Sequence, residues 1–251
     1  MNDADLATDP KLAERIEHAF AYPFARPACS YLFAQGRMHP LPPDFVEGRH
    51  AVVASGSNAA PARLAAKFGD DDGVIPVTRA VLHDFAVVFA GHFTAYGAIP
   101  ATLVPFPGAR TDVWITWLTC EQLTLMHRSE GVIGCREVAQ RYDYLVLEGL
   151  DLRPERMSSL SKAGAYLSRR MLAPEGQPIR FAEALSLDCS LKAWPERRLL
   201  QATHRLLQPS QSFSRFMSTV LRSPNDRQAL FEDLTPHTIR RSCDGPYPAI
   251  S

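Results

Sequence analysis

The sequence contains no long apolar run and no surplus of charge of either sign. None of its stretches approaches the roughly 18 apolar residues of a membrane helix, and its start, MNDADLATDPKLAER, is acidic and polar, unlike a signal peptide. Lys+Arg and Asp+Glu both number 27, so the formal net charge is zero. We therefore expect a soluble, cytoplasmic protein without a membrane segment and with no general attraction to nucleic acids.

The usual motifs of metal and nucleophile chemistry are also absent. The five cysteines are scattered without a CxxC pair, and the eight histidines form no HExxH motif. The sequence has no GxSxG nucleophile elbow, no P-loop and no GxGxxG. We expect reduced, mostly buried thiols and neither a bound metal nor a nucleotide cofactor.

The composition is that of an ordinary folded chain, with 46% hydrophobic and 22% charged residues in 251. This length suits one enlarged domain, or a core with appendages. Prolines crowd Pro23 to Pro43, which predicts irregular chain after a first helix over Asp9 to Phe20. We divide the sequence into an N-terminal helix and proline-rich arm (1–46), a core domain (47–182) and a helical C-terminal extension (183–251).

The core domain is expected to be a mixed β-sheet with few helices, hence an α+β fold. A short strand at His50 to Ala54 precedes a turn and a helix that ends near Gly69. A Pro107-Gly108 turn predicts that the β-rich segments on either side of it are antiparallel neighbours. Further strands are predicted over 74–89, 142–150, 163–167 and 179–181, and helices over 119–130, 196–207 and 212–234. The extension is expected to pack on the core or on a second subunit, so a homodimer is one of two arrangements.

Two local features are candidates for chemistry. The turn Ser55-Gly56-Ser57-Asn58 precedes a helix, and its consecutive backbone N–H groups would suit a carboxylate or another anion. Glu130 falls in the last turn of a predicted helix, where the negative end of the helix dipole disfavours a carboxylate. The plainer interpretations are a helix N-cap for the turn and an exposed surface glutamate for Glu130.

Taken together, the motifs resemble the γ-glutamylcyclotransferase-like (AIG2-like) family. The resemblance covers roughly His50 to Leu167 and rests on the order of VVASGSN, PARLAAKFG, LHDFAVVFAG, IPATLVPFPGARTDVWITWLT and HRSEGV. Members of that family carry a YGSN turn, an aTl-x-PG hairpin and an LDxxEG helix end. The resemblance implies a small, mainly antiparallel β-barrel from about His50 to Phe181 with a few flanking helices.

The resemblance also implies a set of site residues. Glu130 matches the family's catalytic acid/base, and Gly56, Ser57 and Asn58 match its substrate-holding turn. Tyr144 and Tyr166 resemble tyrosines that line the family's pocket, although half-buried strand aromatics are the plainer interpretation for both.

Two positions depart from the family pattern. Ser55 stands where the turn begins with tyrosine, and His127 stands where the LDxxEG aspartate is expected. We expect Ser55 to line the pocket with the rest of the turn. Because the phenol of the family's tyrosine is missing there, a larger or more polar pocket is predicted.

The activity that the resemblance implies needs no cofactor. In a γ-glutamyl amide the α-amine attacks its own γ-carbonyl, which gives 5-oxoproline and a free amine or amino acid. The expected partner is therefore a small γ-glutamyl substrate. Two other hypotheses stay open: a non-catalytic ligand-binding or interaction module on the same fold, and an amidohydrolase in which water replaces the substrate amine.

Overall fold

The computed structural model describes residues 9–69, 73–134 and 141–241. In these ranges it contains a closed five-stranded barrel and six α-helices, an α+β arrangement. The expected mainly antiparallel β-barrel with flanking helices and a largely helical C-terminal part is confirmed. Two of the five cysteines, Cys135 and Cys243, lie outside the described residues, and the other three are unbonded thiols.

The barrel closes through one parallel pairing. Its strands follow the order β4-β5-β3-β7-β6, and β6 pairs with β4 to complete the ring. All neighbours are antiparallel except β3 and β7, where Val52 lies opposite Gly164. The barrel strands are β3 (His50–Ala54), β4 (Ile75–Phe89), β5 (Ala101–Leu118), β6 (Tyr142–Pro154) and β7 (Leu160–Ser168).

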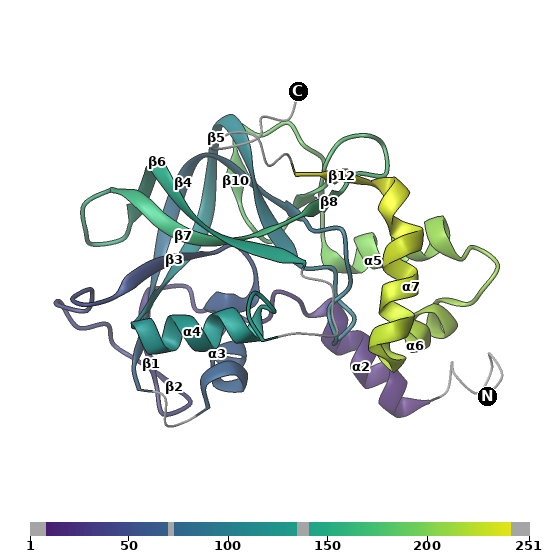
Figure 1. Cartoon of the computed structure of the whole chain (residues 1–251), viewed down its shortest axis with the longest axis horizontal. Coiled ribbons are helices and arrows are strands. Elements are labelled where there is room, and N and C mark those ends of the chain that lie inside the picture. The colour runs from purple at the N-terminus through teal and green to yellow at the C-terminus, as the bar shows by residue number, and fades with distance from the viewer. Residues whose placement is uncertain (1–8, 70–72, 135–140, 242–251) are drawn as a thin grey trace.

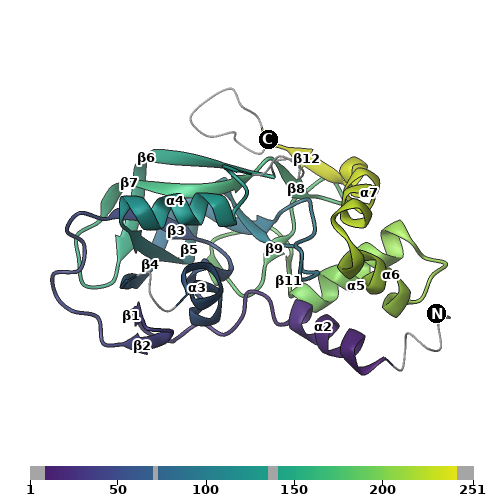
Figure 2. The same ribbon diagram turned by 60° about the horizontal axis from the view of Figure 1, so that its bottom comes forward.

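Two helices cover the barrel at the end where β3 finishes (Figures 1 and 2). A short 3-10 turn, η1 (Ser57–Ala59), leads into α3 (Pro61–Phe68), which has proline at its first position and ends at Gly69. Helix α4 (Cys120–Ser129) begins with a capping box formed by Thr119 and Gln122. Buried side chains of α3 and α4, among them Leu64, Phe68 and Met126, pack with barrel residues in a second hydrophobic cluster.

The two ends of the chain pack together beside the barrel. Helix α2 (Pro10–Phe20) lies against α6 (Phe213–Arg222), and Figure 1 shows α2 and the C-terminal helices on one side of the molecule. Their apolar faces join the main core of the barrel. The other C-terminal helices are α5 (Glu196–Leu207), α7 (Pro224–Leu234) and the 3-10 turn η2 (Thr235–His237).

The remaining strands are short and lie at the margins of the barrel. The two strands that come first in the chain, β1 and β2, form a hairpin, and β1 also pairs with β4. These strands are β1 (Tyr31–Ala34), β2 (Arg37–His39), β8 (Arg170–Leu172), β9 (Arg180–Phe181), β10 (Ser186–Leu187), β11 (Ala193–Trp194) and β12 (Thr238–Arg240).

Three local expectations are wrong. The proline-rich arm is not wholly irregular, because it forms the β1–β2 hairpin. Pro107-Gly108 does not separate two strands: β5 runs through it as one strand, and the Gly108 N–H bonds the side chain of Asp84 across a bulge at 2.7 Å. The predicted helix over 212–234 is two helices, since Ser223 caps α7 and Pro224 starts it.

Candidate functional site

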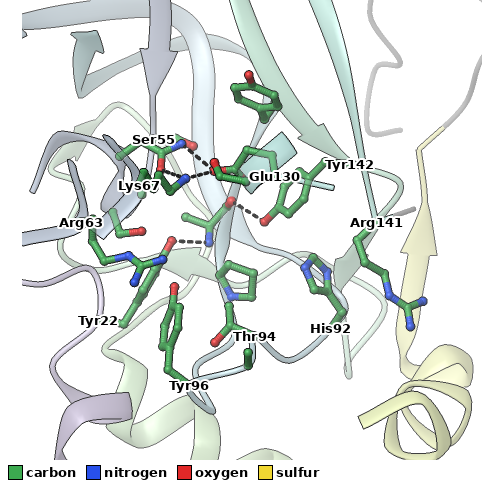
Figure 3. Close-up of a pocket in the computed structure, with 18 of the residues that line it drawn as sticks. Tyr22, Ser55, Arg63, Lys67, His92, Thr94, Tyr96, Glu130, Arg141 and Tyr142 are labelled. Atoms are coloured by element: carbon green, nitrogen blue, oxygen red, sulfur yellow. Dashed lines mark hydrogen bonds and ion pairs between the residues drawn. The ribbon is translucent and has the colours of Figure 1, made fainter. Parts of the chain in front are cut away.

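A cavity of about 300 Å³ opens where β3, α3 and the end of α4 meet (Figure 3). Its other walls come from the connection between β4 and β5, from the arm and from the start of β6. Among the described residues none after Tyr166 lines it, so the C-terminal extension up to residue 241 contributes no lining side chain. The polar and aromatic lining residues are Tyr22, Ser55, Ser57, Asn58, Arg63, Lys67, His92, Thr94, Tyr96, Ser129, Glu130, Arg141, Tyr142 and Tyr166, with Gly56 and Ala101 among the small ones.

The turn from Ser55 to Asn58 lines one side of this cavity. At Gly56 an added Cβ would lie 2.1 Å from the hydroxyl of Tyr22, so only glycine allows this aromatic side chain to approach. The Asn58 amide donates to Glu130 Oε1 at 3.0 Å. The turn and Glu130, more than seventy residues apart in sequence, therefore meet in one cavity.

Glu130 is the residue at which α4 ends, and its side chain is only 16% exposed. Lys67 of α3 forms an ion pair with Glu130 Oε1 and also donates to Asn58 Oδ1 at 2.7 Å. Burial by itself raises the pKa of Glu130, but the Lys67 charge, the two hydrogen bonds and the more distant charge of Arg63 together hold it below its usual value. Glu130 is thus an ionised carboxylate at neutral pH. Its negative charge is stabilised by Lys67, because the negative end of the helix dipole gives it no stabilisation.

Two tyrosine hydroxyls hold the backbone of Ala101 at the floor of the cavity. The Ala101 N–H donates to Tyr22 Oη at 2.8 Å, and Tyr142 donates to the Ala101 carbonyl at 3.2 Å. Burial raises the pKa of both phenols well above the ordinary value. They are therefore neutral groups that can hydrogen-bond but carry no charge.

A second group combines Ser57, Tyr96 and Arg63. Ser57 and Tyr96 both line the cavity, and the Arg63 guanidinium lies over the Tyr96 ring with 4.9 Å between its central carbon and the ring centroid. Burial raises the pKa of the Tyr96 phenol, and the charge of Arg63 partly offsets this. This group extends the turn into a polar wall with one positive charge.

The two tyrosines named from the sequence have different positions. Tyr166 lines the cavity, and its hydroxyl is 2.8 Å from His127 Nδ1. Tyr144 does not line the cavity; it packs on the rings of Tyr166 and His127 and covers Gly164. His127, at the position of the family's aspartate, thus belongs to an aromatic cluster behind the site, and burial lowers its pKa.

Sequence reasoning missed several residues of the cavity. Tyr22 and Tyr96 come from the arm and from the β4–β5 connection, and no local motif marks them. Arg63 and Lys67 did leave a signal, because they are four residues apart in the helix that follows the turn and so share one face of it.

In the described ranges no group of three or more His, Cys, Asp or Glu side chains could hold a metal ion. None of the described helices is long and apolar enough to cross a membrane. The chemistry of the cavity thus rests on one carboxylate, two cations near it, neutral phenols and the backbone of the turn.

Comparison with known proteins gives structural neighbours only. No protein-family model and no curated protein matches the sequence. Among similar solved structures, a γ-glutamyl cyclotransferase has 18% identity and a TM-score of 0.37, with 48% of this chain and 66% of that chain covered. A protein from Arabidopsis thaliana, solved in solution, has 16% identity, a TM-score of 0.35 and coverages of 48% and 69%. An uncharacterized protein from Homo sapiens has 20% identity, a TM-score of 0.35 and coverages of 49% and 68%. The chain thus spans just under two thirds of the cyclotransferase, and we base its function on the cavity.

Proposed function

We propose that the protein is a cofactor-free γ-glutamylcyclotransferase-type enzyme that releases 5-oxoproline from a γ-glutamyl amide. The observation that carries the proposal is the meeting of an ionised Glu130 with the Gly56–Asn58 turn in one cavity. A base beside a set of amide and hydroxyl donors is what an intramolecular aminolysis requires. The substrate supplies its own nucleophile, so no metal or cofactor is needed.

The reaction needs one proton to move between two nitrogens. The substrate's α-amine attacks the γ-carbonyl carbon, a C–N bond forms, and Glu130 accepts the proton that the amine loses. The tetrahedral intermediate then collapses, the original amide C–N bond breaks, and Glu130 returns the proton to the leaving nitrogen. Because the pKa of Glu130 is low, its protonated form is a strong acid that gives the proton up readily.

The other cavity residues position the substrate and stabilise charge. Backbone N–H groups of the turn and the neutral phenol of Tyr22, which accepts from the Ala101 N–H and keeps its own proton free, are donors available to the oxyanion that develops on the γ-carbonyl. Lys67 keeps Glu130 ionised and oriented. The cavity is small enough to hold the γ-glutamyl group in the folded shape that ring closure demands.

A second candidate function rests on the Lys67–Glu130 ion pair itself. Lys67 and Asn58 both bind Glu130 Oε1, so this oxygen is already occupied by donors. A permanently engaged carboxylate would suit a ligand-binding module without turnover. In the cyclotransferase, by contrast, the second oxygen of Glu130 must receive the proton.

The decisive experiment replaces Glu130 by Gln and follows the products by mass spectrometry. Purified protein is incubated with γ-glutamyl-ethylamide and γ-glutamyl-alanine. A cyclotransferase gives 5-oxoproline, an amidohydrolase gives glutamate, and a binding module gives neither while still binding the compounds. In Glu130→Gln, turnover should fall by about 10²- to 10⁴-fold, the usual contribution of a general base.

Two controls separate loss of chemistry from loss of structure. Glu121→Gln changes an exposed glutamate in the first turn of the same helix and should leave turnover intact. The double variant Lys67→Met/Glu130→Gln removes both charges of the buried pair and leaves no unpaired ion, so it tests activity in a neutral cavity. Wild-type turnover in a folded Glu130→Gln protein would refute the mechanism.

A further inference from the structure

Arg63 is a cation at the cavity wall that lacks an anionic partner among the described residues. Its guanidinium packs against two neighbouring aromatic rings, 4.9 Å from the centroid of Tyr96 and 5.7 Å from that of Phe24. Its Nε is buried and makes no hydrogen bond within the described ranges. A buried donor without an acceptor is costly, and it marks a place where a ligand can supply one.

The other two cations of the described lining are already held by protein groups. The lining contains three side chains that carry a permanent positive charge, Arg63, Lys67 and Arg141, and one carboxylate, Glu130. Lys67 is paired with Glu130. Arg141 lies over the ring of Phe231 at 3.5 Å and donates to Gln228, so its guanidinium is held by α7. Arg63 is the cation that an incoming anion would meet.

The position of Arg63 indicates which anion. It lies over the ring of Tyr96, and Arg63, Tyr96 and Ser57 of the turn line the same cavity. Its charge also reaches Glu130. In a γ-glutamyl group the α-amine and the α-carboxylate are attached to one carbon atom. If the amine reaches Glu130, the carboxylate must lie nearby, and two negative groups so close need a cation.

We propose that Arg63 binds the α-carboxylate of the γ-glutamyl group and thereby selects substrates that carry it. This assignment rests on the proposed function. The planar guanidinium, fixed by the two rings, offers a carboxylate two parallel N–H donors. The enzyme should therefore accept γ-amides of free glutamate and discriminate against analogues that retain the amine but lack the carboxylate.

A pair of substrates tests this assignment. In γ-glutamyl-ethylamide the α-carboxylate is the only anionic group, and 4-aminobutyryl-ethylamide is the same compound without it, able to cyclise to 2-pyrrolidinone. In the wild-type protein kcat/KM should be about 10- to 100-fold higher for the first compound, the range expected for a charge-assisted pair. In Arg63→Met this advantage should vanish, because kcat/KM falls far more for γ-glutamyl-ethylamide than for the truncated compound.

The control is Arg198→Met. Arg198 also lies over an aromatic ring, that of Trp194 at 4.4 Å, but it is outside the cavity. Arg198→Met should leave kcat/KM unchanged for both substrates. Equal losses for both substrates in Arg63→Met, or no loss for either, would overturn the assignment while the cyclotransferase stands.

Failure of the proposed function is recognised separately. If the wild-type protein turns over neither compound, calorimetric titration with γ-glutamyl-ethylamide decides the role of Arg63. Tighter binding to the wild-type protein than to Arg63→Met, by the same 10- to 100-fold, supports the carboxylate site without catalysis. Equal affinity, or no binding to either protein, overturns it.

Discussion

Replacing Lys67 by Met tests how the buried ion pair is balanced. Lys67 and Glu130 are 8% and 16% exposed at their side chains, so neither charge is well solvated. In the variant, Glu130 keeps the hydrogen bond from Asn58 and the distant charge of Arg63 but loses its direct counter-ion. The largest single influence on its pKa, burial, then dominates, and the pKa should rise above the ordinary value of about 4.3.

The consequence for stability depends on pH, and the sign follows from linkage. In the wild-type protein the pKa of Glu130 is lowered on folding, so its contribution is present above about pH 4.3 and is lost as the pH falls through the folded-state pKa. In Lys67→Met the pKa is raised, so stability is lost as the pH rises. The variant should be less stable by about 3–5 kcal/mol at neutral pH, the usual effect of leaving a buried charge unpaired. The difference should shrink towards pH 4.

Urea denaturation of both proteins between pH 4 and 7 measures this difference. The double variant Lys67→Met/Glu130→Gln carries no unpaired charge and should recover most of the loss at pH 7. If turnover is present, the acid limb of its pH profile should also move to higher pH in Lys67→Met. A stability deficit that does not depend on pH, or no recovery in the double variant, would refute the electrostatic reasoning.

Four further predictions concern other parts of the structure. Gly56→Ala should displace the Tyr22 ring and cost about 1–3 kcal/mol of stability, as overpacked sites do, and adding Tyr22→Phe, which removes the clashing hydroxyl, should restore part of it in thermal unfolding. Ser55→Tyr should shift the substrate ranking towards small γ-glutamyl compounds in a competition assay, and an unchanged ranking would mean that position 55 does not contact substrate. Burial raises the pKa of Glu196 far above its usual value, so the wild-type protein loses stability as the pH rises above the ordinary value of about 4.3, and Glu196→Gln should gain stability relative to wild type over that rise. Removing residues 183–251 should expose apolar core and reduce solubility; a truncated protein as soluble as the full chain would contradict this.

The sequence was most informative where residue preferences at helix ends could be applied. Glu130 broke a local rule, because a carboxylate ends a helix there, and the structure shows a buried, paired group at this position. The helix predicted over 119–130 and the helix end predicted near Gly69 agree closely with the structure. The barrel itself was expected from the order of motifs and could not be derived from periodicity alone.

The sequence was least informative where distant segments meet. Pro107-Gly108 has the composition of a turn, but pairing with β4 on both sides of it, through residues 101–105 and 110–116, keeps β5 continuous and makes the dipeptide part of a bulge. Tyr22 enters the cavity from the arm because α2 packs on α6, a contact between opposite ends of the chain. Tyr144 was expected to line the pocket, but its side chain packs over Gly164 and lies outside the cavity lining. Each outcome depends on tertiary packing that leaves no local pattern.

The parallel pairing of β3 with β7 sets the order in which the cavity can be assembled. The β4–β5 and β6–β7 pairs join segments that are neighbours in sequence. Val52 of β3, by contrast, pairs with Gly164 of β7, which is over a hundred residues later in the chain. Contacts of such long sequence separation carry the largest loop-closure entropy, and they slow folding. Because Tyr166 of β7 lines the cavity, a nascent chain released before β7 is made has the Ser55–Asn58 turn and Glu130 but an incomplete cavity wall. Formation of the β3–β7 pairing is thus a slow step in assembling the cavity. Substitutions in this pairing should delay the appearance of ligand binding during refolding more than they alter the final affinity.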